Sequence, residues 1–126
     1  MKKNIIQTEC PVRDILDRLG DKWSVLIIVT LNERTLRFSE LKREISDISQ
    51  RMLTLTLKNL ERDGLLTRTV YATVPPRVDY ALTDLGKIFH SEISGLVSWA
   101  KKYRPEIEKS REVYDKKKAE FLQPQI

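Results

Sequence analysis

The chain of 126 residues is predicted to fold as a single, mostly helical α+β domain over residues 1–126. Apolar residues recur at helical spacing through its first half, and two runs of β-forming residues follow at 65–71 and 77–82. Helical spacing then returns from residue 83 onward. Because 40% of the residues are hydrophobic and the length fits one domain, this pattern can build a real core.

The N-terminal segment predicts two helices in succession. Proline suits the first helical position, so the first helix is expected to open at residues 10–11, and Gly20 is placed to end it. Its apolar residues recur at helical spacing: Val12, Ile15, Leu16 and Leu19. Asp21 can cap a second helix, and residues 23–31 are apolar on several faces. This second helix is therefore expected at the buried centre of the domain.

The next two helices are joined by a tight turn. Residues 36–45 predict a short amphipathic helix whose stripe holds Phe38, Leu41 and Ile45. Residues 46–49 are rich in turn and capping residues, and a second helix then runs over 50–63 and ends at Gly64. One face of this helix carries Leu53, Leu57 and Leu60. Two helices with this spacing predict a helix-turn-helix.

A hairpin is predicted directly after Gly64. Pro75 and Pro76 separate the two β-rich runs, where they forbid a regular ladder and force a turn. In the second run Val78, Tyr80 and Leu82 alternate with Arg77, Asp79 and Ala81. The alternation predicts one packed face.

The C-terminal part predicts two more helices. Thr83 is expected to cap a long helix that reaches about Tyr103, and Pro105 to start a charged helix that ends near Phe121. The order of elements is that of a winged helix-turn-helix with additional helices at both ends.

The composition excludes several classes of protein. There are 23 Lys and Arg against 18 Asp and Glu, and a net charge of +5 suits a nucleic-acid partner without proving one. One His and one Cys cannot supply a metal site of several such ligands, and the glycine-rich cofactor motifs are missing, so neither metal nor cofactor is expected. An enzyme is not expected either, because nothing in the sequence places Cys10 beside His90 as a nucleophile with its base.

Membrane association is also not expected. No apolar run reaches the roughly 18 residues that a membrane helix needs, and the N-terminus lacks the pattern of a signal peptide. A single cysteine cannot form an internal disulfide, so a cytoplasmic protein is the default.

The second helix of the helix-turn-helix, about residues 49–63, carries the side chains that suit DNA. Such a helix presents its N-terminal half to the major groove. Opposite its leucine face lie Gln50, Arg51, Thr54 and Lys58. Gln50 and Arg51 can make bidentate contacts to base edges, whereas the hydroxyl and ammonium groups suit phosphates.

The hairpin, about residues 66–82, is expected to be the wing. Arg77 near its tip and Arg68 at its base would lie near the DNA backbone or the minor groove. The full set of expected DNA-contacting residues is Ser39, Ser49, Gln50, Arg51, Thr54, Lys58, Arg68 and Arg77.

Several stretches of the sequence resemble one known family. They are CPV at 10–12, LGDKW at 19–23, RFSEL at 37–41, ISQRMLT at 48–54, LKNLERDGL at 57–65 and VPPRVDYALTDLG at 74–86. In this combination the chain resembles the HxlR-type family of bacterial winged-helix regulators. The resemblance covers roughly residues 9–103, so we take 10–103 as the family core and 104–126 as a charged C-terminal helix outside it.

The resemblance implies a homodimeric transcriptional regulator that binds a near-palindromic operator, an inverted repeat in double-stranded DNA. In such families the terminal helices form the dimer, and the two recognition helices enter successive major grooves about 34 Å apart. The helix at 84–103 carries more apolar surface than a hairpin and two short helices can cover, which agrees with a dimer. A monomer whose N-terminal helix covers that surface stays open as an alternative.

Cys10 is the candidate for a signal-sensing residue. Some members of the family sense oxidants or electrophiles through a cysteine just before the first helix, the position that Cys10 occupies. A thiolate there would be stabilised by the helix N-terminus. Without a second cysteine, oxidation would give a sulfenic acid, a mixed disulfide or a Cys10–Cys10 bridge across a dimer. The alternative is a structural Cys10 in a regulator that responds to an unknown small-molecule effector.

A third alternative is a winged helix that serves as a protein–protein interaction module without binding DNA. Internal ion pairs that engage Arg51, Lys58 and Arg77 would favour this hypothesis.

Overall fold

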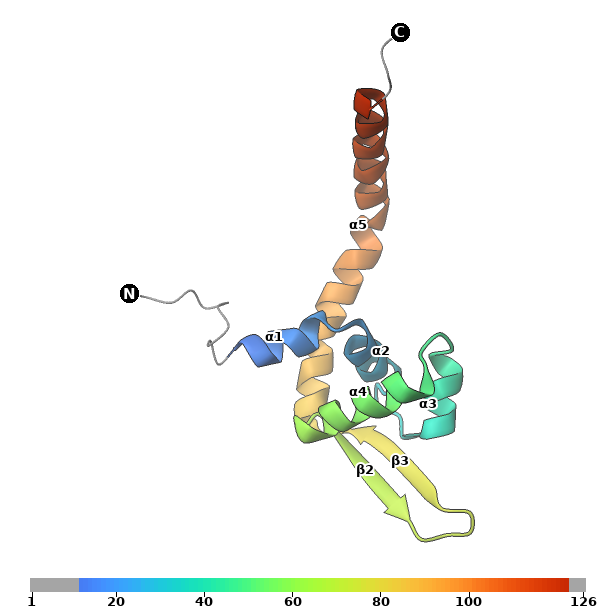
Figure 1. Cartoon of the computed structure of the whole chain (residues 1–126). Helices are drawn as coiled ribbons and strands as arrows, with labels where there is room; N and C mark the ends of the chain where they lie inside the picture. Colours follow the sequence, from blue (N-terminus) through green and yellow to red (C-terminus); the bar gives the residue numbers. More distant parts are fainter. Residues whose placement is uncertain (1–11, 123–126) are drawn as a thin grey trace, which may run out of the picture. The chain divides into compact units, whose positions relative to one another are not determined.

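The computed structural model describes residues 12–122, and the order of its elements differs from the predicted one only by an additional short strand and by a single C-terminal helix in place of two (Figure 1). The elements are α1 (Arg13–Gly20), α2 (Lys22–Thr30), β1 (Leu36–Arg37), α3 (Phe38–Glu44), α4 (Gln50–Arg62), β2 (Leu66–Tyr71), β3 (Arg77–Leu82) and α5 (Asp84–Leu122). They fall into two compact units, of which the first ends at Ile93 and the second begins at Ser94 within α5. The predicted winged helix-turn-helix is confirmed in the first unit.

Helix α2 contributes Ser24, Ile27 and Ile28 to the core of the first unit, whereas its Leu26 and Val29 are exposed, so the predicted burial is confirmed for one face of this helix only. The side chain of Asp21 accepts a hydrogen bond from the Ser24 backbone N–H at 3.3 Å, which satisfies one of the free donors at the helix start. The fully buried side chains of this unit come mostly from α2, α3 and α4; they are Ser24, Ile27, Ile28, Leu31, Leu41, Ile48, Leu53, Leu57, Leu60, Leu66 and Ile93. The predicted start of the first helix at residues 10–11 lies outside the described residues, and α1 has Val12 as its N-cap.

The helix-turn-helix consists of α3, a turn and α4. The Glu40 carboxylate accepts a hydrogen bond from the Arg37 backbone N–H at 2.9 Å, which fixes the start of α3. Helix α4 has the predicted leucine face, which is buried together with Thr56. It ends where predicted, because Gly64 adopts φ 78°, a left-handed conformation that favours glycine.

The sheet has three strands, one more than the sequence predicts. Its order is β1-β3-β2, both pairs are antiparallel, and Leu36 lies opposite Tyr80. Residues 36 and 37 were expected at the start of the short helix, and this prediction is wrong. Two residues are too few to show the alternation by which a strand is identified, and their pairing partner lies more than 40 residues away in sequence.

Asp79 departs from the predicted alternation. The prediction placed it on the exposed face of the hairpin, yet it is 5% exposed. Strand β3 is the central strand of the sheet and is covered by neighbours on both edges, and the Asp79 carboxylate is paired with Arg77. An ion pair of this kind allows a carboxylate to be buried.

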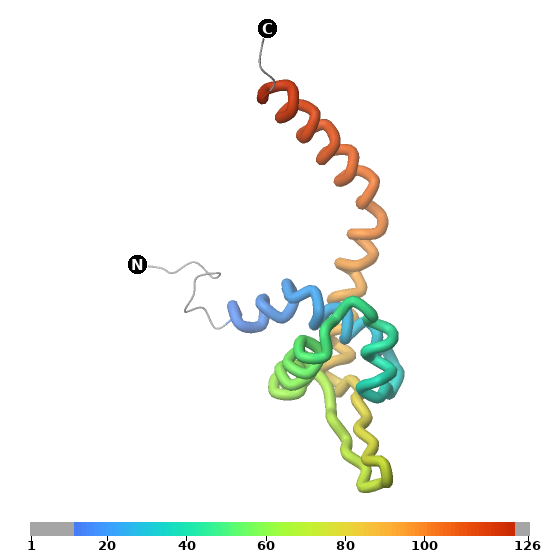
Figure 2. The backbone as a smooth tube through the Cα atoms, turned by 45° about the vertical axis from the view of Figure 1, so that its right-hand side comes forward, coloured from blue at the N-terminus to red at the C-terminus, as the bar shows by residue number. Residues whose placement is uncertain are grey.

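The hairpin returns the chain to α5, which packs closely on the end of α4. The Thr83 hydroxyl donates to the Gly64 carbonyl at 2.6 Å and accepts from the Gly86 N–H at 3.0 Å, so the predicted cap is confirmed. A Cβ atom at Gly86 would collide with the Leu65 carbonyl. Figure 2 shows the hairpin projecting from the helices of this unit.

Helix α5 does not break at Pro105. We expected two helices there, but a single helix runs from Asp84 to Leu122 with Pro105 inside it. A proline removes one backbone hydrogen bond from a helix without always ending it. The Arg104 Nε donates to Glu108 at 2.7 Å, and this pair spans the proline.

Candidate nucleic-acid interface

The face of α4 opposite its leucines is open to solvent. Gln50, Arg51, Thr54 and Lys58 are all exposed, and with Leu55 they line a depression of about 620 Å³ along the helix. The polar face lies on the side of α4 opposite the buried leucines, so the packing of the leucines against the core turns the polar face toward solvent. The polar face is therefore held on a rigid support.

Arg51 and Lys58 carry unpaired charge. Neither has an ion-pair or hydrogen-bond partner among residues 12–122. An exposed guanidinium without an internal partner keeps its five donors available to a ligand. Internal ion pairs at Arg51 and Lys58 would have favoured a protein–protein module. Neither residue has such a pair among the described residues.

Two of the hydroxyl groups expected to contact DNA form hydrogen bonds with the backbone of the first turns of α4. The Ser49 Oγ accepts from the Met52 backbone N–H at 3.1 Å and so caps the helix. The Thr54 hydroxyl donates to the Gln50 carbonyl at 2.9 Å. Ser49 keeps its own hydroxyl hydrogen, whereas the Thr54 hydrogen is directed into the helix.

The wing cation Arg77 is held by an internal partner. Its Nε and Nη2 donate to the two carboxylate oxygens of Asp79, each at 2.9 Å. Its guanidinium also lies over the ring of Tyr71, with 5.3 Å between Cζ and the ring centroid. Tyr71 is opposite Arg77 in the β2–β3 register. Arg77 is therefore fixed in position, and part of its charge is compensated.

The ion pair shifts the acid–base equilibria of both partners. Hydrogen bonds from Arg77 lower the pKa of Asp79 against the opposing effect of desolvation, and the charges of Arg77 and Arg37 lower it further. The same hydrogen bonds raise the pKa of Arg77. Asp79 is consequently a carboxylate, and Arg77 a cation, at neutral pH.

Ser39 and Arg68 are also exposed, in the first turn of α3 and on β2 respectively. Arg68 lies opposite Tyr80 in the β2–β3 register, at the base half of the hairpin. The structure thus presents every expected DNA-contacting residue on the surface of the first unit, and it brings Gln50, Arg51, Thr54 and Lys58 together on one face.

Sequence reasoning missed Asp79 and Tyr71 as residues that position Arg77. The signal was present in the hairpin. Residues 77 and 79 lie two apart on one strand and so point to the same side, and the register places residue 71 across from residue 77.

Three expectations concern other parts of the chain. Cys10, the expected sensing residue, lies outside the described residues. Within residues 12–122 no three His, Cys, Asp or Glu side chains are grouped so that they could hold a metal ion. None of the helices in that range combines the length and the apolar character that crossing a membrane requires.

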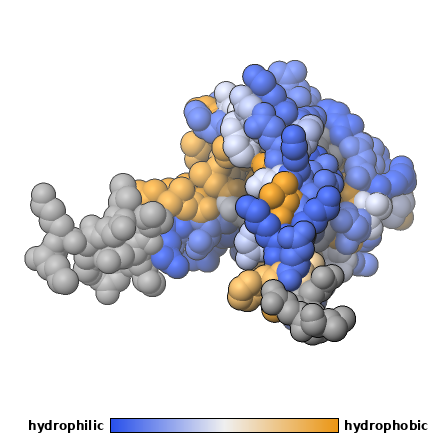
Figure 3. Space-filling model, turned by 90° about the horizontal axis from the view of Figure 1, so that it is seen from above, coloured by the Kyte–Doolittle hydropathy of each residue, from blue (hydrophilic) through white to orange (hydrophobic). Residues whose placement is uncertain are grey.

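Apolar side chains are exposed where α1 approaches the first turns of α5. A depression of about 790 Å³ has walls from these helices and from the end of α4. Its most exposed apolar residues are Ile15, Leu85 and Ile88, at 62%, 53% and 61%. Figure 3 shows apolar surface on α1. Surface of this kind is typical of a contact with another chain.

Comparison with known proteins gives a consistent result over most of the chain. Residues 18–108 match the family described as HxlR-like helix-turn-helix. The HTH-type transcriptional regulator YtfH of Escherichia coli K12 is 41% identical over 104 residues, which are 82% of this chain and 82% of YtfH.

Solved structures agree in fold. The transcriptional regulator ytfH from Salmonella typhimurium superposes with a TM-score of 0.80 at 38% identity and covers 88% of this chain and 99% of its own. The redox regulator HypR in its reduced form gives a TM-score of 0.73 at 37% identity, covering 79% of this chain and 98% of its own.

Proposed function

The chain belongs to the HxlR-like helix-turn-helix family of transcriptional regulators, and from this premise we propose that it binds an inverted repeat in double-stranded DNA as a homodimer. Its matched relatives are regulators rather than enzymes, in agreement with the sequence. The proposal assigns α4 to the major groove and the β2–β3 hairpin to the wing. A regulator of this kind acts in the cytoplasm, where its DNA is.

The observation that carries the proposal is the pair of unpaired cations on the polar face of α4. Arg51 and Lys58 have no partner among the described residues, and Gln50 lies beside them. Arg and Gln are the side chains that read guanine and adenine edges, and Lys contacts phosphate. In the proposal Arg51 and Gln50 read bases, and Lys58, Ser39 and Ser49 contact the backbone. Thr54 contacts the backbone once its hydroxyl turns away from the Gln50 carbonyl. Arg68 and Arg77 approach the backbone or the minor groove.

A homodimer is supported by the exposed apolar residues of α1 and of the start of α5. Ile15, Leu85 and Ile88 are each more than half exposed, and a second copy that meets the same surface would cover them. Two recognition helices related by a two-fold axis would then match the two halves of an inverted repeat.

We further propose that Cys10 senses oxidants or electrophiles. The support is the position of Cys10 before the first helix and the likeness to HypR, a redox regulator solved in oxidised and reduced forms. As the single cysteine, Cys10 would respond through a sulfenic acid, a mixed disulfide or a bridge to the second copy.

The test is selection of random duplex DNA by the purified chain, with and without the thiol oxidant diamide. We expect an enriched inverted repeat that is lost on oxidation, and a Cys10→Ser variant that selects the same repeat and ignores diamide. An Arg51→Ala/Lys58→Ala variant should enrich nothing. The charge-matched control Lys101→Ala/Lys116→Ala, which removes two exposed cations of the second unit, should behave as the parent chain.

Two results would contradict the proposal in different ways. If the parent chain enriches no sequence, DNA binding is wrong and the protein–protein module is favoured. If the Cys10→Ser variant still responds to diamide, the regulator stands but Cys10 is not its sensor.

A further inference from the structure

Leu55 is an apolar side chain on the polar face of α4. It is 51% exposed, and it lines the same depression as Arg51 and Lys58. Because an α-helix turns by about 100° per residue, Leu55 points only about 40° away from Arg51 and about 60° away from Lys58. Leu55 therefore belongs to the face that the proposed function turns toward DNA, although the sequence predicts only polar contacts there.

The packing of the core does not account for a leucine at this position. The next residue, Thr56, is polar and yet only 3% exposed, and its hydroxyl donates to the Met52 carbonyl at 2.7 Å. Helix α4 thus buries a threonine and exposes a leucine, which is the reverse of the usual amphipathic order. The buried face of α4 is complete without Leu55, so this side chain is free to contact a partner.

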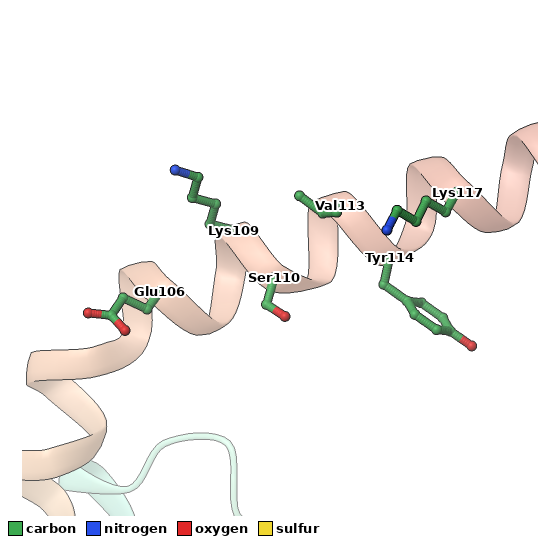
Figure 4. Close-up of a pocket in the computed structure, with 6 residues that line it drawn as sticks. All are labelled: Glu106, Lys109, Ser110, Val113, Tyr114 and Lys117. Atoms are coloured by element: carbon green, nitrogen blue, oxygen red, sulfur yellow. The ribbon is translucent and has the colours of Figure 1, made fainter.

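The surroundings of Leu55 suit a polyanionic partner. Among residues 12–122, those that line its depression include two cations and no carboxylate. A depression of about 450 Å³ on α5 shows the contrast, because there Val113 and Tyr114 lie beside two lysines but also beside Glu106 (Figure 4). A carboxylate repels the phosphate groups of DNA. Of these two depressions, the one on α4 combines an apolar side chain with cations alone.

The major groove of DNA offers one apolar group at the base edges, the C5-methyl group of thymine, and apolar side chains contact it. A leucine has neither donor nor acceptor, so this methyl group is the part of a base edge that it can recognise. Leu55 lies four residues after Arg51, which is about 6 Å farther along the helix axis. For a helix that runs along the groove, this offset corresponds to about two base pairs.

We propose that Leu55 contacts the methyl group of one thymine in each half-site, about two base pairs from the base that Arg51 reads. The inference rests on the DNA binding of the proposed function and deepens it. It adds an apolar specificity-determining residue to the polar ones, and it gives the selected repeat a thymine at a defined distance from the Arg51 contact.

Replacement of single methyl groups in the DNA tests this contact. In the selected duplex each thymine would be replaced in turn by deoxyuridine, which lacks only the C5-methyl group. We expect one thymine in each half-site whose replacement weakens binding of the parent chain about fourfold, the effect of uncovering one methyl-sized group. Leu55→Ala should bind the thymine and the uracil duplex equally well, because both changes remove the same contact. The unfolding midpoint of this variant should stay near that of the parent chain, since Leu55 packs in no core.

The matched control is Thr54→Ser, which removes another exposed methyl group of α4 and keeps the hydroxyl. This variant should retain the fourfold preference for thymine. The assignment of Leu55 is overturned, and DNA binding stands, if uracil has no effect at any position or the half-site contains no thymine. The same holds if the preference persists in Leu55→Ala or is lost in Thr54→Ser instead. A parent chain that selects no duplex overturns both the inference and the proposed function.

Discussion

Arg51 on α4 and Arg77 on the wing are both exposed arginines, but they differ in what holds them. Arg51 has no partner among the described residues, whereas Arg77 is bound at both ends of its guanidinium fork by Asp79 and lies over Tyr71. The free cation can adjust to a base edge and contributes its full charge. The bound cation is fixed in position, and Asp79 compensates its charge. The two arginines are thus suited to different tasks: Arg51 to contacting a base edge, and Arg77 to holding a fixed position on the wing.

The largest effect is expected from removing the free arginine. Arg51→Ala should cost about 1–3 kcal/mol of binding to the selected repeat and relax the preference at one position in each half-site. Because Arg51 is exposed and packs in no core, the thermal unfolding midpoint should stay unchanged. Affinity for the selected repeat and for its single-base variants would measure the effect. An equal loss on all duplexes would assign Arg51 to a phosphate instead.

A smaller effect is expected from the free lysine. Lys58→Ala should weaken binding to specific and scrambled duplexes alike and lower the slope of log affinity against log salt by about 1. Titrations at several salt concentrations would determine the slope. A loss confined to the selected repeat would show that Lys58 reads a base.

The bound arginine should contribute less to the salt dependence than Lys58. The double variant Arg77→Gln/Asp79→Asn removes one positive and one negative charge, so its salt slope should equal that of the parent chain. Its affinity should still fall, because the amide pair places no cation at the wing. A slope reduced as much as in Lys58→Ala would mean that Asp79 does not compensate Arg77 in the complex.

The smallest effect concerns stability in acid. Because Arg77 lowers the pKa of Asp79 in the folded chain, the pair stabilises the fold above the unfolded value of about 3.9, and this contribution is lost as the pH falls through the lower folded value. The unfolding midpoint of the parent chain should therefore fall more steeply below about pH 4 than that of Asp79→Asn. Thermal unfolding at a series of pH values would measure both, and identical curves would contradict the contribution of the pair.

The sequence predicts the regular parts of the fold well, because they depend on local patterns. The leucine face of α4, the cap at Asp21 and the end at Gly64 all follow from spacing and residue type. The continuation of α5 through Pro105 was not predicted, because the residue type alone does not determine whether a helix ends at a proline or continues through it. The contacts around the proline also matter, and here they include the pair of Arg104 with Glu108.

One part of the candidate site, the polar face of α4, was predicted from the sequence, and another part, the ion pair of Arg77, was not. The α4 face follows directly from helical spacing, since it is the complement of Leu53, Leu57 and Leu60. The ion pair of Arg77 with Asp79 was not predicted, although both residues were placed on one side of the same strand, because the alternation assigned that side to solvent. What local alternation does not show is the pairing of β3 with β1, a strand of only two residues from a distant part of the chain, which places Arg37 beside Asp79.

The central claim is that Arg51 reads a base, and it can be tested at the level of single atoms. In the selected duplex each guanine would be replaced in turn by 7-deazaguanine, which lacks the N7 acceptor that an arginine uses. We predict one position in each half-site where this replacement weakens the parent chain but has no further effect on Arg51→Ala, since the two changes remove the same contact. Additive losses at every guanine would contradict the claim.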